Sequence, residues 1–129
     1  MFNTLIAEDN VAFRHSLHRM LTERFPFMQI DEAGDANAVM RQALARRFDL
    51  IFMDIRLPLG NGLQLTEAIK AVFVDTVICI LTSHDLPEYR DAALRYGADL
   101  FMVKGDSTEI EILKMVEHIF GDEIDNHLH

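Results

Sequence analysis

The chain has 129 residues, of which 50% are hydrophobic and 26% are charged, so its composition indicates one globular domain and argues against a disordered, fibrous or repetitive protein. Twelve Lys and Arg stand against 21 Asp and Glu, which makes the formal net charge −9. A negative surface repels phosphate backbones and anionic lipids, so we expect neither direct nucleic-acid binding nor membrane binding. No apolar stretch approaches the roughly 20 residues that a spanning helix needs, and we expect a cytoplasmic protein.

The first third of the chain alternates short apolar runs with helical patterns. Residues 2–7 predict a strand, and the apolar spacing over residues 11–25 predicts a helix with Asn10 as its cap. Residues 28–33 predict a second strand. A second helix follows, for which Asp35 or Asn37 is the candidate cap.

The middle of the chain holds the most apolar predicted strand. Residues 50–53 are four consecutive apolar residues, a pattern typical of a central parallel strand that is covered on both faces. A turn over residues 57–62 precedes a helix over residues 63–72, and residues 77–81 predict the fourth strand. The single cysteine, Cys79, lies in this fourth run, and we interpret it as a buried core residue rather than a reactive thiol.

The last third of the chain completes an alternating pattern. Pro87 opens a helix that Gly97 ends as a left-handed cap; residues 100–103 predict a strand, and residues 107–120 a final helix with Ser107 as its cap and Gly121 as its stop. We expect one domain over residues 1–121 and a short polar tail over residues 122–129. Five strands that alternate with five helices predict an α/β fold with a doubly wound, five-stranded parallel sheet.

Polar residues directly follow four of the predicted strands: Glu8 and Asp9, Asp54, Thr82, and Lys104. Parallel strands bring these side chains to one edge, where ligands bind in such sheets. Three carboxylates in one pocket repel one another unless a cation neutralises them, and oxygen ligands suit Mg²⁺. The added lysine and hydroxyl suit a phosphoryl group that is transferred to or from a carboxylate, with Asp54 as the nucleophile. Each residue alone has an ordinary structural interpretation, but their joint occurrence indicates a functional site.

Over essentially its whole length the chain resembles the receiver domain of two-component response regulators, the CheY-like superfamily with a flavodoxin-like fold. The resemblance rests on the acidic pair, on residues 53–58 with Gly62, on residues 81–83 and on residues 97–104. In motif style it is most similar to receivers that precede helix-turn-helix (LuxR-type) DNA-binding domains. It departs from the family in Glu8, where Asp is more frequent, and in Gly105, where many members have proline.

The resemblance implies a set of site residues. Asp9, Asp54 and the backbone carbonyl of Arg56 would ligate Mg²⁺, while Glu8 would act at the metal through water. Lys104 and Thr82 would hold phosphoryl oxygens.

The resemblance also implies partners and a switch. A sensor histidine kinase or a phosphotransfer protein would supply the phosphoryl group to Asp54, so the domain would catalyse its own phosphorylation and dephosphorylation. Thr82 and Phe101 would then move and change the surface over residues 87–120, although Phe101 is equally well interpreted as plain core. The output would be a downstream effector protein, a DNA-binding domain of a longer regulator, or a homodimer formed on phosphorylation.

Two other functions are compatible with these residues. A receiver-like module that signals through protein contacts without phosphorylation (a pseudo-receiver) is the main alternative, and the complete site argues against it. A small phosphatase with an aspartyl-phosphate intermediate ranks last, because Arg56 stands where such enzymes need a second Asp. Arg56 and His84 are expected to tune phosphoryl lifetime. His15 and His18 lie one helical turn apart and could chelate a metal, but solvated surface histidines are the favoured interpretation.

Overall fold

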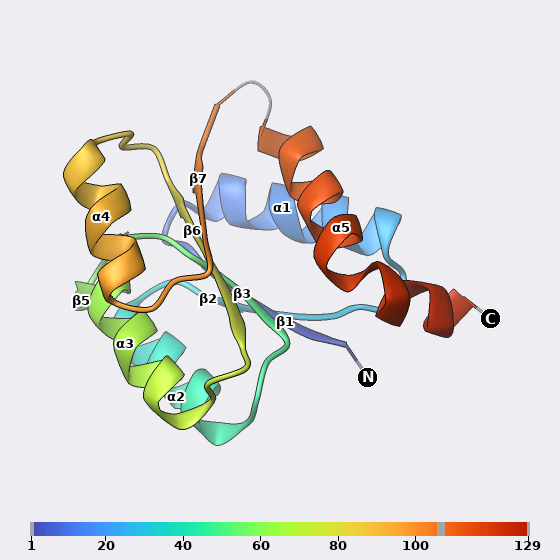
Figure 1. The fold of residues 1–129 in the computed structure, drawn as a ribbon, viewed down its shortest axis with the longest axis horizontal. Helices are drawn as coiled ribbons and strands as arrows, with labels where there is room; N and C mark the ends of the chain where they lie inside the picture. The colour runs from blue at the N-terminus through green and yellow to red at the C-terminus, as the bar shows by residue number, and fades with distance from the viewer. Residues whose placement is uncertain (1, 106–107, 129) are drawn as a thin grey trace.

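The computed structural model of the protein describes residues 2–105 and 108–128. Five parallel strands form one sheet in the order β2-β1-β3-β6-β7 (Figure 1). The strands are β1 (Asn3–Ala7), β2 (Gln29–Ala33), β3 (Leu50–Met53), β6 (Val77–Thr82) and β7 (Leu100–Val103). The order reverses between β1 and β3, so the predicted doubly wound α/β sheet is confirmed.

Helices cover both faces of the sheet (Figure 1). They are α1 (Val11–Arg24), α2 (Ala36–Ala45), α3 (Gly62–Val72), α4 (Pro87–Arg95) and α5 (Thr108–Leu128). The helices α1 and α5 lie on one face, and α2, α3 and α4 lie on the other. No helix in the described ranges is long and apolar enough to cross a membrane.

Side-chain alternation along the strands builds two hydrophobic cores. In β3, Leu50 and Phe52 pack toward α1 and α5, whereas Ile51 and Met53 pack toward α2 and α3. All four are fully buried, as predicted for a central strand. Cys79 lies in the core beside α1 and α5, and burial raises the pKa of its thiol to about 12. The interpretation of Cys79 as core is confirmed.

Short polar side chains fix where the helices begin. The side chain of Asn10 accepts a hydrogen bond from the Phe13 N–H at 2.9 Å, as predicted. Of the two candidate caps of α2, Asp35 is the one used, and its carboxylate accepts from the Ala38 N–H at 2.8 Å. Asn61 caps α3, so this helix begins one residue earlier than the apolar spacing indicates.

A small hairpin lies between β3 and α3, where the sequence indicated only a turn. Its strands, β4 (Arg56–Leu57) and β5 (Gly60–Asn61), pair antiparallel. The turn between them puts Leu59 at a φ of 68°, a left-handed conformation that L side chains rarely adopt. The hairpin fixes the path of the chain that directly follows Asp54.

The helix predicted over residues 107–120 is interrupted at its predicted end, but Gly121 does not form the stop. The interruption falls one residue earlier, at Phe120 (φ −116°, ψ 17°), and helical residues then continue to Leu128. Gly121 does not adopt the left-handed conformation that makes glycine a helix stop. The Phe120 ring at the kink is buried against Phe2, with the ring centroids 4.7 Å apart. The other predicted cap, Ser107, lies outside the described residues.

Candidate functional site

One open cavity of about 320 Å³ lies at the carboxyl edge of the sheet. Its walls are formed by the residues that directly follow β1, β3, β6 and β7, because the strands run parallel and end at the same edge. Its lining comprises Glu8, Asp9, Asn10, Asp54, Arg56, Thr82, Ser83, His84 and Lys104. The structure therefore brings together every residue that the sequence analysis assigned to metal or phosphoryl chemistry.

Three carboxylates form the acidic side of this cavity. Oxygen atoms of Glu8, Asp9 and Asp54 lie within 4.8 Å of one another. Glu8 and Asp54 are only 3% and 8% exposed, whereas Asp9 is exposed. Among the His, Cys, Asp and Glu side chains that the structure describes, this is the only group of three close enough to share an ion. The pair of His15 and His18 therefore completes no second such group.

Lys104 supplies the positive charge of the site. Its ammonium donates hydrogen bonds to Glu8 and, at 3.2 Å, to Asp54 Oδ2. Burial lowers the pKa of Lys104, but the hydrogen bond to Glu8 and the charge of Asp54 outweigh it and hold the pKa above its usual value. Lys104 is therefore a cation at neutral pH. The Phe13 ring lies 4.5 Å from Nζ and lines one side of the ammonium.

Thr82 offers a hydroxyl at the end of β6. It is 1% exposed, and its Oγ accepts a hydrogen bond from the His84 N–H at 3.2 Å. Its backbone carbonyl accepts from the Lys104 N–H at 2.8 Å, which ties the ends of β6 and β7 together. A hydroxyl that accepts one hydrogen bond still has its own proton to donate.

Phe101 lies on β7, and two strands, β3 and β6, separate β7 from β1, which the acidic pair follows. It is half-buried and packs against the core beside α4. The guanidinium of Arg90, from α4, lies 4.7 Å above its ring. The side chain is thus partly core and partly covered by an exposed cation, and this geometry is compatible with either interpretation of Phe101.

Arg56 and His84 lie at the outer rim of the cavity. Arg56 is exposed, and its Nη2 lies 3.3 Å from the Tyr89 hydroxyl of α4. The His84 ring stacks loosely on Tyr89, with the centroids 6.2 Å apart. Tyr89 could not be identified from the sequence, because one aromatic residue in a helical pattern carries no sign of which loop it faces.

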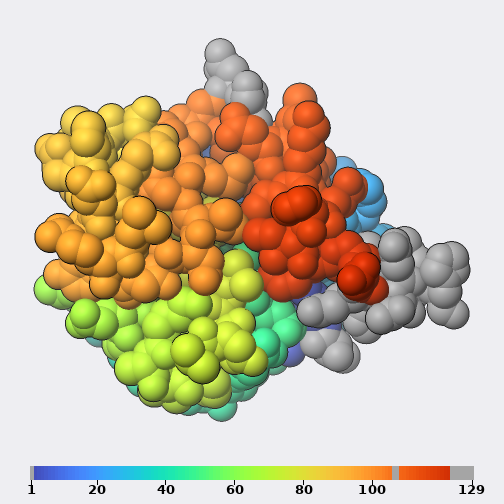
Figure 2. Space-filling view, in the orientation of Figure 1, coloured from blue at the N-terminus to red at the C-terminus, as the bar shows by residue number. Residues whose placement is uncertain are grey.

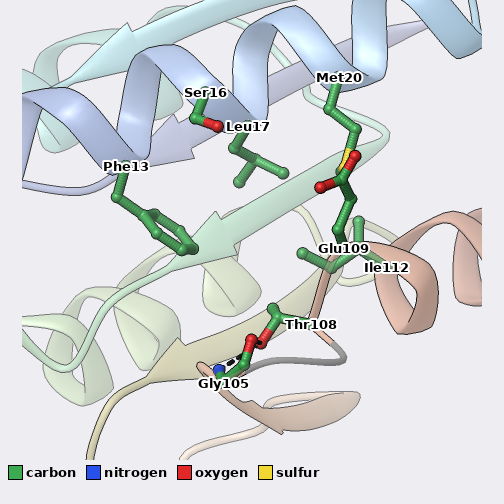
Figure 3. A pocket seen from close by; sticks show the side chains of 8 residues that line it. All are labelled: Phe13, Ser16, Leu17, Met20, Gly105, Thr108, Glu109 and Ile112. Carbon is green, nitrogen blue, oxygen red and sulfur yellow. Dashed lines mark hydrogen bonds between the residues drawn. The ribbon is translucent and has the colours of Figure 1, made fainter.

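A second hollow, of about 180 Å³, lies between α1 and the start of α5 (Figure 3). Figure 3 shows side chains of α1 on one side and residues from the β7–α5 connection and α5 on the other. Its lining comprises Phe13, Ser16, Leu17, Met20, Gly105, Thr108, Glu109 and Ile112. Glu109 is its one ionisable lining residue, so this hollow lacks the charge arrangement of the carboxyl-edge cavity.

Comparison with known proteins gives consistent matches. A sequence model of the family described as "Response regulator receiver domain" matches residues 4–117. The "Probable transcriptional regulatory protein NarL" of Mycobacterium tuberculosis is 30% identical over 112 residues, which are 87% of this chain and 51% of that protein. The chain therefore spans about half the length of this curated relative.

Two solved structures extend the comparison to the fold. A CheY-like response regulator receiver domain protein from Methanospirillum hungatei superposes with a TM-score of 0.85 at 22% identity, and the match covers 98% of each chain. The response regulator TrrA from Thermotoga maritima, solved in complex with Mg²⁺-BeF, superposes with a TM-score of 0.74 at 26% identity. That match covers 88% of this chain and 98% of the other.

Proposed function

The chain belongs to the response regulator receiver domain family of two-component systems, and from this premise we propose that it accepts a phosphoryl group on Asp54 with Mg²⁺ as cofactor. The observation that carries the proposal is the composition of one cavity. It holds three carboxylates, an ammonium and a buried hydroxyl at the ends of four parallel strands. Capping or solvation of single residues does not require this combination.

The charge of the cavity supports a divalent cation. The three carboxylates and the Lys104 ammonium together carry a net charge of about −2, which one divalent cation offsets. The Arg56 guanidinium also borders the cavity, but it is exposed and lies against the Tyr89 hydroxyl. An all-oxygen donor set with an open, exposed side suits Mg²⁺, which keeps several waters. Asp9, Asp54 and the backbone carbonyl of Arg56 would hold the ion, and Glu8 would act through water. When bound, Mg²⁺ would offset the negative charge of phosphoryl oxygens. The similar structure of TrrA was solved in complex with Mg²⁺-BeF, which supports Mg²⁺ as the cation.

The residues of the cavity have different roles in phosphoryl transfer. A carboxylate oxygen of Asp54 attacks the phosphorus of a phosphohistidine on the partner, so an O–P bond forms while the P–N bond breaks. The electron pair of the broken bond stays on the histidine nitrogen. Lys104 and Thr82 donate hydrogen bonds to the phosphoryl oxygens, where charge is concentrated. The product is an acyl phosphate on Asp54.

The phosphodonor and the output follow from family membership. A sensor histidine kinase or a phosphotransfer protein in the cytoplasm would donate the group. The curated relative NarL is named a transcriptional regulator, and this chain spans about half its length. We therefore expect the output to be a DNA-binding domain in a longer chain or a separate effector protein.

The signal would leave through the face formed by α4, β7 and α5, which lie side by side in Figure 2. Phosphorylation would draw the Thr82 hydroxyl toward the phosphoryl group, and Phe101 would turn into the space that it leaves. A modification that biases such a two-state element by a few kcal/mol makes the minor conformer the major one. Size-exclusion chromatography with beryllofluoride tests whether this face then supports a homodimer.

Intact mass after incubation with acetyl phosphate tests the proposal. We expect one phosphoryl adduct in the wild type with Mg²⁺, and none with a chelator or in Asp54→Asn. Asp91→Asn is the matched control, because Asp91 is exposed on α4 and outside the cavity, and it should keep the adduct. If the wild type forms no adduct under any of these conditions, the pseudo-receiver alternative replaces the proposal.

Arg56 and His84 are proposed to set how long the phosphoryl group survives. Both line the cavity that holds Asp54. A long cationic side chain at position 56 would shield the acyl phosphate, so we expect faster dephosphorylation in Arg56→Ala. An unchanged rate in this variant would show that Arg56 is an ordinary exposed loop residue.

A further inference from the structure

Arg14, near the start of α1, reaches back to the end of β1. Its Nη1 donates a hydrogen bond to the Glu8 carbonyl oxygen at 2.8 Å, and its Nε donates to Glu32 Oε1 at 2.6 Å. The side chain is 17% exposed, so most of it is removed from water. Arg14 therefore bridges the residue that opens the acidic cluster and the neighbouring edge strand β2.

The hydrogen bond from Arg14 to the Glu8 carbonyl lies directly after the last paired residue of β1. Pairing of β1 with β2 and β3 ends at Ala7, and the Glu8 N–H makes one last bond, to the Ala33 carbonyl at 3.0 Å. The next carbonyl, that of Glu8, belongs to the peptide that joins Glu8 to Asp9. We propose that Arg14 is a positioning residue that fixes this peptide and thereby aims both carboxylates into the cavity.

The Arg14 guanidinium is held in place by Glu32, which lies outside the cavity. Glu32 Oε2 lies 2.6 Å from His18 Nδ1, so the carboxylate that receives Arg14 is anchored to α1 as well as to β2. Burial raises the pKa of Glu32, but its hydrogen bonds to His18 and Arg14 outweigh burial and hold the pKa below its usual value. Glu32 therefore stays ionised at neutral pH, and the Arg14 fork is locked in one orientation.

Room for the guanidinium depends on a glycine. A Cβ atom at Gly34 would lie 2.9 Å from Arg14 Nη1, closer than such atoms approach. The atom it meets is the far end of a flexible side chain, so an alanine there moves the guanidinium rather than the backbone. Gly34→Ala is thus a way to displace Arg14 without removing its charge.

Whether Mg²⁺ binds more weakly or more tightly when Arg14 is replaced shows whether Arg14 acts by orienting the ligands or by its charge. Loss of a positive charge near three carboxylates would by itself strengthen Mg²⁺ binding. Loss of a group that orients metal ligands weakens binding, by about tenfold or more for outer partners of ligands. The inference rests on the proposed function, because it assigns Arg14 a role toward the ion that Asp9 and Asp54 are proposed to hold.

The test is isothermal titration calorimetry with MgCl₂ alone, on the wild type, Arg14→Gln, Gly34→Ala and Arg19→Gln. Arg19→Gln is the matched control, because it makes the same charge change at an exposed position of the same helix. We expect Mg²⁺ to bind about tenfold more weakly to Arg14→Gln and to Gly34→Ala than to the wild type. The Mg²⁺ dissociation constant of Arg19→Gln should equal that of the wild type. Thermal unfolding of each variant verifies that the titrated protein is folded.

The inference is overturned if the Mg²⁺ dissociation constant of Arg14→Gln is within twofold of the wild-type value or lower than it. If Arg14→Gln does not fold, Gly34→Ala decides by the same criterion. These outcomes leave the proposed function intact, because the wild type still binds Mg²⁺ and still forms the Asp54 adduct. If the wild type binds no Mg²⁺, the metal-dependent function and the inference fail together.

Discussion

Replacing Gly62 by alanine should damage both the fold and the site, because the added methyl group has no room. An ideal Cβ at Gly62 would lie 1.9 Å from the Asp54 carbonyl oxygen and 3.0 Å from the Ile55 Cα. The first contact is more than 1 Å too short, since ordinary contacts begin near 3.4 Å. The clashing atoms are backbone, so the chain around Asp54 has to move. That movement also strains the Gly62 N–H bond to the Ile55 carbonyl, which is 2.8 Å long.

The magnitude follows from the size of this displacement. Overpacking of a rigid site costs 1–3 kcal/mol and sometimes more, and we expect a loss of about 3 kcal/mol in the free energy of unfolding. For a chain of this length such a loss lowers Tm by roughly 10 °C. A misplacement of about 1 Å at the reacting carboxylate slows phosphoryl transfer on the order of a hundredfold.

Urea unfolding and the rate of adduct formation with acetyl phosphate measure the two effects. Gly105→Ala is the control, because a Cβ there meets no atom of the described residues within 4 Å although the residue adjoins Lys104. We expect the control to change the free energy of unfolding by less than about 1 kcal/mol. If Gly62→Ala is as stable as the wild type, the reasoning from the close approach is refuted.

Three further predictions concern single positions. Cys79 should resist iodoacetamide in the native protein, because burial raises the pKa of its thiol to about 12, and should react in urea; equal labelling rates would contradict this. The pKa of Glu32 is held below its usual value, so the stability that it contributes is complete above its unfolded pKa, near 4.3, and is lost as the pH falls through its folded pKa. Between pH 5 and pH 3, urea unfolding should therefore show a steeper loss of stability in the wild type than in Glu32→Gln, and parallel curves would refute the assignment. Leu59 has a positive φ and is 73% exposed, so Leu59→Gly should be about 1 kcal/mol more stable than Leu59→Ala, the reverse of the usual order of these residues; thermal unfolding of the pair checks the sign.

Most of the site could be predicted from the sequence because its parts stand at the ends of recognisable strands. Four apolar residues followed by Asp54 locate both the central strand and the proposed acceptor. The same reasoning places Glu8, Thr82 and Lys104, since parallel strands present their carboxyl ends to one edge. Asn10 and Gly97 were likewise predictable, because helix caps depend on residues a few positions apart.

The break in the last helix was not predictable in the same way. Glycine usually ends a helix by adopting a left-handed conformation, and that local rule pointed to Gly121. The structure places the break at Phe120, whose ring is anchored on Phe2 at the other end of the chain. The residue at the break is thus one with a contact distant in sequence, and a local rule does not contain that contact.

Local sequence patterns were enough to predict the class of fold, the edge of the sheet that carries the candidate site and the residue types in it, because periodicity and strand ends are local properties. The tertiary structure alone decided which charges meet. Lys104 reaches Glu8 across 96 positions, and Arg14 reaches Glu32 across 18. Such pairs depend on strand order and register, which no local pattern records. In the sequence, Arg14 is therefore indistinguishable from the other charged residues of α1. Only the folded sheet brings the Glu8 carbonyl and the Glu32 carboxylate within hydrogen-bond distance of its guanidinium.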